Sequence, residues 1–328
     1  MKAMVYTEYG PPEVLQLKEV AKPTPKEDEV LVKVYAASVN FGDLSFMRGK
    51  PFLVRLMGAG LLKPKTKILG ADIAGRVEAV GEDVNQFQPG DEVFGDISAW
   101  GFGGFAEYVA APEIALAKKP ANLTFEEAAA VPMAGVVALQ GLRDKGHIQS
   151  GQRVLINGAS GGIGTFAVQI AKSFGAEVTG VCSTRNLDMV RSIGADQVID
   201  YTQEDFAQNE GHYDLIVATA GYRSIFDYRR ALSPNGTYVV TGGSMAQIFQ
   251  PMFLGPWISM TGSKKMRNLS AKPDQKDLVF VSDLIEAGKV VPVIDRRYPL
   301  NEVPEALRYY GEGHSRGKVV VTVEHGSA

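Results

Sequence analysis

The stretch Arg153-Val-Leu-Ile-Asn-Gly-Ala-Ser-Gly-Gly-Ile-Gly-Thr165 decides how the central part of this chain folds. It begins with a run of apolar residues long enough for one buried strand, and then crosses a glycine-rich turn. A helix-like pattern follows from Thr165 to Phe174. Glycines in such a turn let the backbone approach a phosphate closely, and the helix N-terminus offers unpaired N–H groups. This strand–turn–helix context favours a dinucleotide-binding site over an ordinary tight turn.

The residues predicted to bind the dinucleotide phosphates are those that form the turn and begin the helix. Their spacing is Ala159-x-Gly161-x-x-Gly164, with an alanine where the first glycine of the fingerprint usually stands. The predicted contacts are Ser160, Gly161, Gly162, Ile163 and Gly164.

Length and composition limit the other possibilities. A chain of 328 residues favours two domains, and 45% hydrophobic with 22% charged residues is typical of globular proteins. The formal net charge of −3 gives no electrostatic footprint for nucleic acid. There is no apolar stretch of about 20 residues for a membrane helix, and no signal-peptide pattern at the N-terminus. A single cysteine, Cys182, excludes an intramolecular disulfide. We therefore expect a cytoplasmic protein without nucleic-acid or membrane partners.

The pattern of secondary structure divides the chain. The first part contains short β-rich segments between proline and glycine turns. Thr124 and Glu127 form a predicted capping box, after which strands and helices alternate as in a parallel, doubly wound sheet. The final strand, 317–323, resembles the first part again. The predicted domains are a β-rich domain of 1–124 and 266–328, and a dinucleotide-binding domain of 125–265.

Short motifs over the whole length carry a family resemblance. They are Ala36-Ala-Ser-Val-Asn-Phe-Gly-Asp43, Leu69-Gly-Ala-Asp-Ile-Ala-Gly-Arg-Val77, Val80-Gly-Glu-Asp-Val84, Pro89-Gly-Asp-Glu-Val-Phe-Gly95, Gly104-Phe-Ala-Glu-Tyr-Val109, Ala128-Ala-Ala-Val-Pro-Met-Ala-Gly135, the glycine turn, and Ser315-Arg-Gly-Lys-Val-Val-Val321. In this order the chain resembles a medium-chain dehydrogenase/reductase of the zinc-independent quinone oxidoreductase-like branch. The resemblance implies an α/β protein with a GroES-like β-rich catalytic domain and a Rossmann domain, with substrate and nicotinamide between them. It also implies a homodimer, in which the apolar region Gln247–Lys265 extends the Rossmann sheet, although a buried internal strand would have the same composition.

The metal ligands of zinc-bearing relatives are largely missing. Such relatives have a cysteine three residues before an aspartate, where this chain has Asn40 before Asp43. They have a His–Glu pair after a glycine, where this chain has Ala71 and Asp72 after Gly70. A catalytic zinc needs three protein ligands from Cys, His, Asp or Glu. The sequence therefore predicts an enzyme without a metal.

The residues that follow the second strand of the dinucleotide-binding domain indicate whether the protein prefers NADH or NADPH. NAD-selective sites carry an acid about 20 residues after the glycines, but Glu177–Cys182 is followed by Ser183-Thr184-Arg185. Hydroxyl groups and a guanidinium can hold a 2′-phosphate, so NADPH is favoured over NADH. The alternative is a solvated loop with an incidental arginine. Resemblance and strand position add further coenzyme contacts: Tyr201, Gly242, Gly243 and Lys318 (or Arg316).

The expected chemistry follows from the missing groups. Without a metal or a histidine acid–base pair, an unactivated alcohol has nothing to stabilise its developing alkoxide. A quinone or α,β-unsaturated carbonyl spreads the arriving electrons and needs mainly proximity and orientation. Asn40 is the candidate carbonyl-orienting donor, and Asp43 fixes its loop; a purely structural role stays open for both. The small apolar acceptor is expected to contact Phe46, Trp100 and Met133.

Three functions stay open at this point. The first is NADPH-dependent reduction of a quinone or α,β-unsaturated carbonyl, and the second is a zinc-free alcohol or carbonyl dehydrogenase. The third is an NADPH-binding protein with little turnover. The apolar insertion around residues 50–67 is either a lid or part of the substrate pocket.

Overall fold

The computed structural model describes residues 1–208, 210–221 and 223–325, apart from the side chain at position 57. These residues form two compact units. The first unit comprises Met1–Met133, Pro273–Ser282 and Pro292–Ala328, and the second comprises Ala134–Lys272 and Asp283–Val291. Both units differ slightly from the predicted domains. Residues 125–133 join the first unit because helix α2 (Phe125–Ala129) packs on its sheet, and β13 (Lys265–Asn268) pairs within the second.

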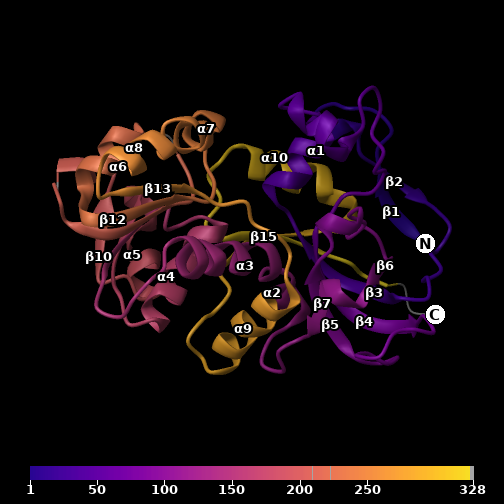
Figure 1. The fold of residues 1–328 in the computed structure, drawn as a ribbon. Coiled ribbons are helices and arrows are strands. Elements are labelled where there is room, and N and C mark those ends of the chain that lie inside the picture. The colour runs from indigo at the N-terminus through magenta and orange to yellow at the C-terminus, as the bar shows by residue number, and fades with distance from the viewer. Residues whose placement is uncertain (209, 222, 326–328) are drawn as a thin grey trace. The chain divides into compact units, whose positions relative to one another are not determined.

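The first unit is built mainly from antiparallel strands (Figure 1). Its larger, seven-stranded sheet has the order β14-β15-β3-β4-β5-β7, with β6 paired to β3. The bounds are β1 Lys2–Val5, β2 Gln16–Glu19, β3 Glu29–Ser38, β4 Asp72–Val80, β5 Glu92–Asp96, β6 Tyr108–Pro112, β7 Leu116–Lys118, β14 Ile294–Pro299 and β15 Lys318–Thr322. Its helices include α1 (Phe41–Arg48) and α10 (Val303–Gly311). Because β15 pairs with β3, the end of the chain lies beside the segment that leads into α1.

The second unit is a parallel sheet with helices on both faces. Its strand order is β10-β9-β8-β11-β12-β13, and every pair is parallel. The strands are β8 Arg153–Asn157, β9 Glu177–Cys182, β10 Gln197–Asp200, β11 Tyr213–Ala218, β12 Leu232–Val240 and β13 Lys265–Asn268. Helices α4 (Gly162–Ser173) and α5 (Leu187–Ser192) lie on one face, and α6 (Ile225–Ala231), α7 (Met245–Phe253) and α8 (Gly255–Thr261) lie on the other (Figure 1). The order reverses between β8 and β11, where doubly wound sheets bind ligands. Helices α3 (Pro132–Gln140) and α9 (Gln275–Glu286) contain residues of both units.

The apolar region Gln247–Lys265 does not form the strand that its composition allowed. It forms α7 and α8, with Pro251 inside α7 and a proline in the first turn of α8. Several large side chains there are exposed, including Phe253 (72%) and Met260 (86%). The strand that extends the sheet comes later, at Lys265–Asn268. Across the described ranges, no helix has the length and apolarity needed to cross a membrane.

Candidate active site

In the glycine turn between β8 and α4, two backbone segments pack closely against each other. The missing side chains leave space for a phosphate. A Cβ added at Gly164 would lie 2.0 Å from the carbonyl oxygen of Gly158, so only glycine fits without a shift. Gly158 has φ of 88°, which favours glycine, and its N–H bonds to the Val181 carbonyl of β9. The first N–H groups of α4 have no partner within the helix. This cradle fits the pyrophosphate of a dinucleotide.

Two serines and a buried asparagine lie next to this turn. The Asn186 amide nitrogen donates to the hydroxyls of Ser160 at 3.0 Å and Ser183 at 3.2 Å. Sequence reasoning identified both serines but missed Asn186, whose side chain is 4% exposed. An asparagine just after a strand tip is a weak signal because it also begins helices as a cap.

The other predicted 2′-phosphate contacts differ in their surroundings. Arg185 and Tyr201 are exposed. The Thr184 hydroxyl instead donates to the Asp200 carboxylate at 2.5 Å, so its hydrogen is already used. This bond and those from Thr202 hold the pKa of Asp200 below its usual value. The sequence placed no acid at the tip of β9, but the fold brings one there from the end of β10.

Gly242 and Gly243 follow β12 and form a tight loop over the end of β11. A Cβ at Gly242 would lie 2.6 Å from the Thr219 carbonyl oxygen. The loop is tied by the buried Gln247, whose amide nitrogen donates to the carbonyls of Ala220 and Gly242. Gln247 also accepts a hydrogen bond from the Tyr228 hydroxyl. Sequence reasoning missed this glutamine because it lies in a segment read only for its apolar residues.

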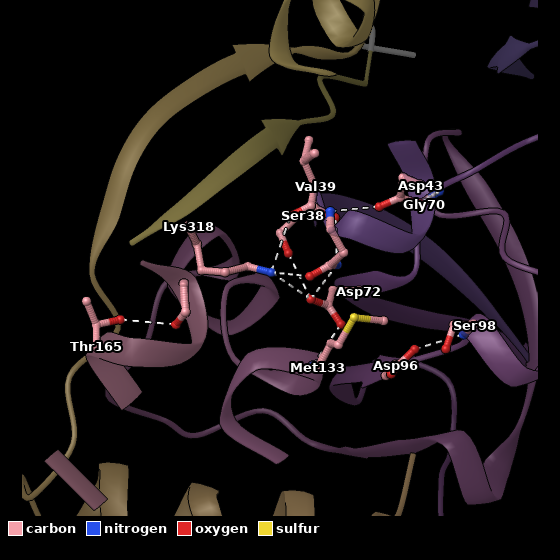
Figure 2. A network of polar contacts seen from close by, with 12 residues as sticks. Ser38, Val39, Asp43, Gly70, Asp72, Asp96, Ser98, Met133, Thr165 and Lys318 are labelled. Atoms are coloured by element: carbon pink, nitrogen blue, oxygen red, sulfur yellow. Dashed lines mark hydrogen bonds and ion pairs between the residues drawn. The ribbon is translucent and has the colours of Figure 1, made fainter. Parts of the chain in front are cut away.

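The first unit contains a buried ion pair between Lys318 and Asp72 (Figure 2). The Lys318 ammonium lies 3.2 Å from the Asp72 carboxylate and 2.5 Å from the side-chain oxygen of Asn40. Asp72 also accepts from the Ser38 hydroxyl and from the Met133 backbone N–H, each at 2.9 Å. The side chains of Lys318 and Asp72 are 4% and 0% exposed. Such a pair is stable only when hydrogen bonds satisfy both charges, as they do here.

The contacts of Asn40 differ from those expected for a free donor. Its amide nitrogen already donates to Asp72 at 2.9 Å and to the Ser38 carbonyl at 3.3 Å. Asp43 accepts from the backbone N–H groups of Asn40 and Gly70, at 2.8 and 2.9 Å. Burial is the main reason that the pKa of Asp43 rises to about 7. Asp43 therefore fixes its loop, whereas a donor role for Asn40 would require one of its bonds to open.

Lys318 also lies in surroundings that the sequence did not indicate. It was predicted to contact the coenzyme, but its ammonium has three acceptors in the first unit, the third being the Val39 carbonyl at 3.4 Å. An ammonium has three hydrogens, so a coenzyme contact would have to replace one of these bonds. One signal in the sequence could have indicated this pair. Lys318 and Asp72 each lie in a strand of mainly apolar residues, β15 and β4, where a buried charge needs a partner of opposite charge.

The residues at the inherited metal positions do not fit a catalytic zinc. Asn40 and Asp72 are directed at a lysine ammonium, and an amide with one carboxylate falls short of three ligands. In the part of the chain that the structure describes, no group of three or more His, Cys, Asp or Glu side chains could hold a metal.

The predicted acceptor contacts all lie in the first unit. The Phe46 and Phe102 rings are 4.8 Å apart, and Trp100, in a short 3-10 helix at Ser98–Trp100, is 40% exposed. The insertion around residues 50–67 contains a short π-helix, Arg55–Ala59. The guanidinium of Arg55 packs over the ring of Tyr9 and so ties this helix to the N-terminal segment. Its exposed apolar side chains are Phe52, Leu53, Leu56, Leu61 and Leu62.

Asp96 beside this network should make stability depend on pH. Burial and the Asp72 charge raise its pKa from 3.8 to about 7, although Ser98 N–H donates to it at 2.8 Å. At pH values between 3.8 and about 7, the Asp96 carboxyl group is protonated in the folded protein and ionised in the unfolded chain. Asp96 should therefore make the free energy of unfolding fall as pH rises, contributing at most about 1.4 kcal/mol per pH unit, and the raised pKa of Asp43 acts in the same direction. Asp96→Asn keeps the oxygen acceptor, so its urea unfolding should show a shallower fall. Identical pH profiles for both proteins would contradict this assignment.

Comparisons with known proteins agree with this architecture. The profile of the alcohol dehydrogenase GroES-like domain matches residues 26–121, and that of the zinc-binding dehydrogenases matches residues 193–321. The chain is 35% identical to the chloroplast envelope quinone oxidoreductase homolog of Arabidopsis thaliana, over 98% of both chains. It is 35% identical to 2-methylene-furan-3-one reductase of Solanum lycopersicum, over 98% of this chain and 79% of that one. The solved quinone oxidoreductase of Coxiella burnetii superposes with a TM-score of 0.87 at 30% identity, over 99% of both chains.

The parallel sheet with a glycine cradle, joined in one chain to a GroES-like unit, defines a two-domain oxidoreductase of the α/β class. The chain belongs to the medium-chain dehydrogenase/reductase superfamily, in its quinone oxidoreductase-like branch.

Proposed function

We propose that the protein transfers a hydride from NADPH to a quinone or an α,β-unsaturated carbonyl, without a metal ion. The observation that carries this proposal is the buried Lys318 ammonium held by Asn40 and Asp72, the residues at the inherited metal positions. It offers a fixed cation where zinc ligands are missing. The names of the relatives, quinone oxidoreductase and 2-methylene-furan-3-one reductase, support the same class of acceptor.

The residues of this chain then have separate tasks. The reduced nicotinamide supplies the hydride, and the glycine turn at Gly158–Gly164 holds the coenzyme phosphates. In the first unit, the weakest bond of the Lys318 ammonium is the one to the Val39 carbonyl, at 3.4 Å. That hydrogen is the one that can turn to the carbonyl oxygen of the acceptor. Hydride addition to a conjugated acceptor places negative charge on this oxygen, which an ammonium stabilises before water protonates it.

A conjugated acceptor is favoured over an alcohol. Oxidation of an alcohol needs a base to take the hydroxyl proton, whereas the ammonium of Lys318, paired with Asp72, can only donate hydrogen bonds. An NADPH-binding protein with little turnover would retain the glycine cradle but would have no use for a buried cation. The experiment that tests the proposal must therefore distinguish it from both an alcohol dehydrogenase and a binding protein.

Steady-state NADPH oxidation should be measured with naphthoquinones, 2-alkenals and simple saturated aldehydes. We expect turnover with one of the first two groups and little with the aldehydes, unchanged after dialysis against a chelator. Turnover restricted to saturated aldehydes or alcohols would favour the carbonyl dehydrogenase. Tryptophan quenching by NADPH without turnover of any acceptor would favour the binding protein. Loss of activity on chelation, restored by zinc, would contradict the metal-free mechanism.

Three finer features complete the proposal. NADPH is preferred over NADH, because the residues that directly follow β9, Ser183 to Arg185, carry hydroxyls and a guanidinium rather than a carboxylate. The protein acts as a homodimer, because α7 and α8 carry exposed apolar side chains such as Phe253 and Trp257. The proposed compartment is the cytoplasm, which suits a free thiol such as that of the buried Cys182. Sedimentation of the protein with and without Trp257→Asp would test the dimer.

A further inference from the structure

The side chain of Asn186 is unusual because one end is fully bonded and the other has no partner. Its amide nitrogen donates to the hydroxyl oxygens of Ser160 and Ser183. Its carbonyl oxygen is buried and has no hydrogen-bond partner among the residues that the structure describes. A buried acceptor without a partner costs about 1–3 kcal/mol, so this arrangement needs a reason.

A direct contact with a ligand does not explain this arrangement, since the side-chain oxygen of Asn186 is buried and not accessible to solvent. The opposite orientation of the amide would leave two buried N–H hydrogens without acceptors, which is worse. The orientation present has a clear effect on the two serines. Each hydroxyl receives a hydrogen bond on a lone pair, so its own hydrogen is left to donate elsewhere. Neither hydroxyl hydrogen has an acceptor within the described part of the chain.

The positions of the two serines identify what they donate to. Ser160 lies in the glycine turn, and Ser183 follows the end of β9, where doubly wound sheets read the ribose 2′ position. Both hydroxyl oxygens lie within 3.2 Å of one nitrogen atom, so they are close enough to serve a single anionic group. A phosphate, which only accepts hydrogen bonds, complements two such donors.

We propose that Asn186 is a positioning residue for coenzyme selectivity: it turns the hydroxyls of Ser160 and Ser183 into a pair of donors for the adenosine 2′-phosphate of NADPH. This inference rests on the proposed function, because it names the group that tells the two coenzymes apart. NADH has no phosphate at this position, so its binding does not need the pair.

The decisive variant is Asn186→Asp, which keeps the size of the side chain and reverses its hydrogen bonding. An aspartate would draw both serine hydrogens to itself and add a negative charge beside the phosphate. Coenzyme binding should be followed by quenching of tryptophan fluorescence, and folding by thermal unfolding without coenzyme. We expect the Kd for NADPH to rise about 100-fold and that for NADH to change less than about threefold. Asn186→Ala should lie between Asn186→Asp and the unsubstituted protein. Asn301→Asp, an exposed position of the first unit, makes the same charge change and should leave both affinities unaltered.

The Ser160→Ala/Ser183→Ala double variant provides an independent test if Asn186→Asp does not fold. It removes the two donors and should also weaken NADPH binding selectively. Equal losses for NADPH and NADH in these variants would assign the serines to the pyrophosphate and overturn the proposal. Unaltered NADPH binding would overturn it as well. After either of these outcomes, the proposed function still stands if the unsubstituted protein binds NADPH and reduces an acceptor. If the unsubstituted protein binds neither coenzyme, the proposed function and the role of Asn186 are both overturned.

Discussion

Replacing Lys318 with methionine should reduce kcat for the quinone or enone acceptor by about 100-fold, the usual effect of removing one donor to a developing oxyanion. The Kd for NADPH should change little, because all three acceptors of the ammonium belong to the first unit. The same change should lower the free energy of unfolding by about 3–5 kcal/mol, since the Asp72 carboxylate is left buried without its cation.

A second variant separates catalysis from stability. Lys318→Met/Asp72→Asn removes both charges; the one amide oxygen of the asparagine can accept from the Met133 N–H, and its NH2 group can donate to the Ser38 hydroxyl, which can accept as well as donate. It should recover most of the lost stability without recovering kcat. The measurements are urea unfolding and steady-state NADPH oxidation at saturating coenzyme. A double variant that is both stable and fully active would show that Lys318 has only a structural role.

Gly164→Ala should abolish useful coenzyme binding, with Kd for NADPH and NADH both raised by roughly 100-fold or more. The added methyl group would lie 2.0 Å from the Gly158 carbonyl oxygen and 2.8 Å from the Ala159 Cα. Both contacts are backbone, so the turn itself must move. Overpacking of this kind also costs about 1–3 kcal/mol of stability.

The matched control for this variant lies outside the glycine turn, at the end of α8. At Gly262 an added Cβ meets its nearest atom at 3.6 Å, an ordinary contact, and the backbone has φ of −151°. Gly262→Ala should therefore bind both coenzymes within a few-fold of the unsubstituted protein. Fluorescence titration of both variants checks the prediction, and equal affinities would mean that the glycine turn does not hold the coenzyme.

Features that depend on neighbouring residues could be predicted well. The strand, turn and helix around Gly158–Gly164 form as expected, because glycine at the crossing and apolar residues on either side act over one turn. The capping box at Thr124 and Glu127 is present. The α/β fold class is confirmed. The helices α7 and α8 were missed because Gln247–Lys265 was interpreted only from its apolar composition. Pro251 lies inside α7, and Pro256 lies in the first turn of α8, where proline is tolerated.

The candidate site was harder to predict, because its residues come from distant parts of the chain. Asn40 was singled out for its residue type, but its partners Asp72 and Lys318 are 32 and 278 positions away. Thr184 was expected to hold a phosphate, and only the pairing of β9 with β10 reveals that Asp200 accepts its hydrogen.

The sequence by itself determined the strand–glycine turn–helix unit, the family and the replacement of two inherited zinc ligands by Asn40 and Ala71, since each depends on which residues stand at short, fixed spacings. The tertiary structure alone decided where each buried polar group finds its partner. A lysine and an aspartate 246 positions apart pair because β15 and β4 both lie beside β3, and a charge removed from water must be satisfied by whatever the fold brings near. The orientation of the Asn186 amide is decided in the same way, by the two serines that the turn and the end of β9 place against it.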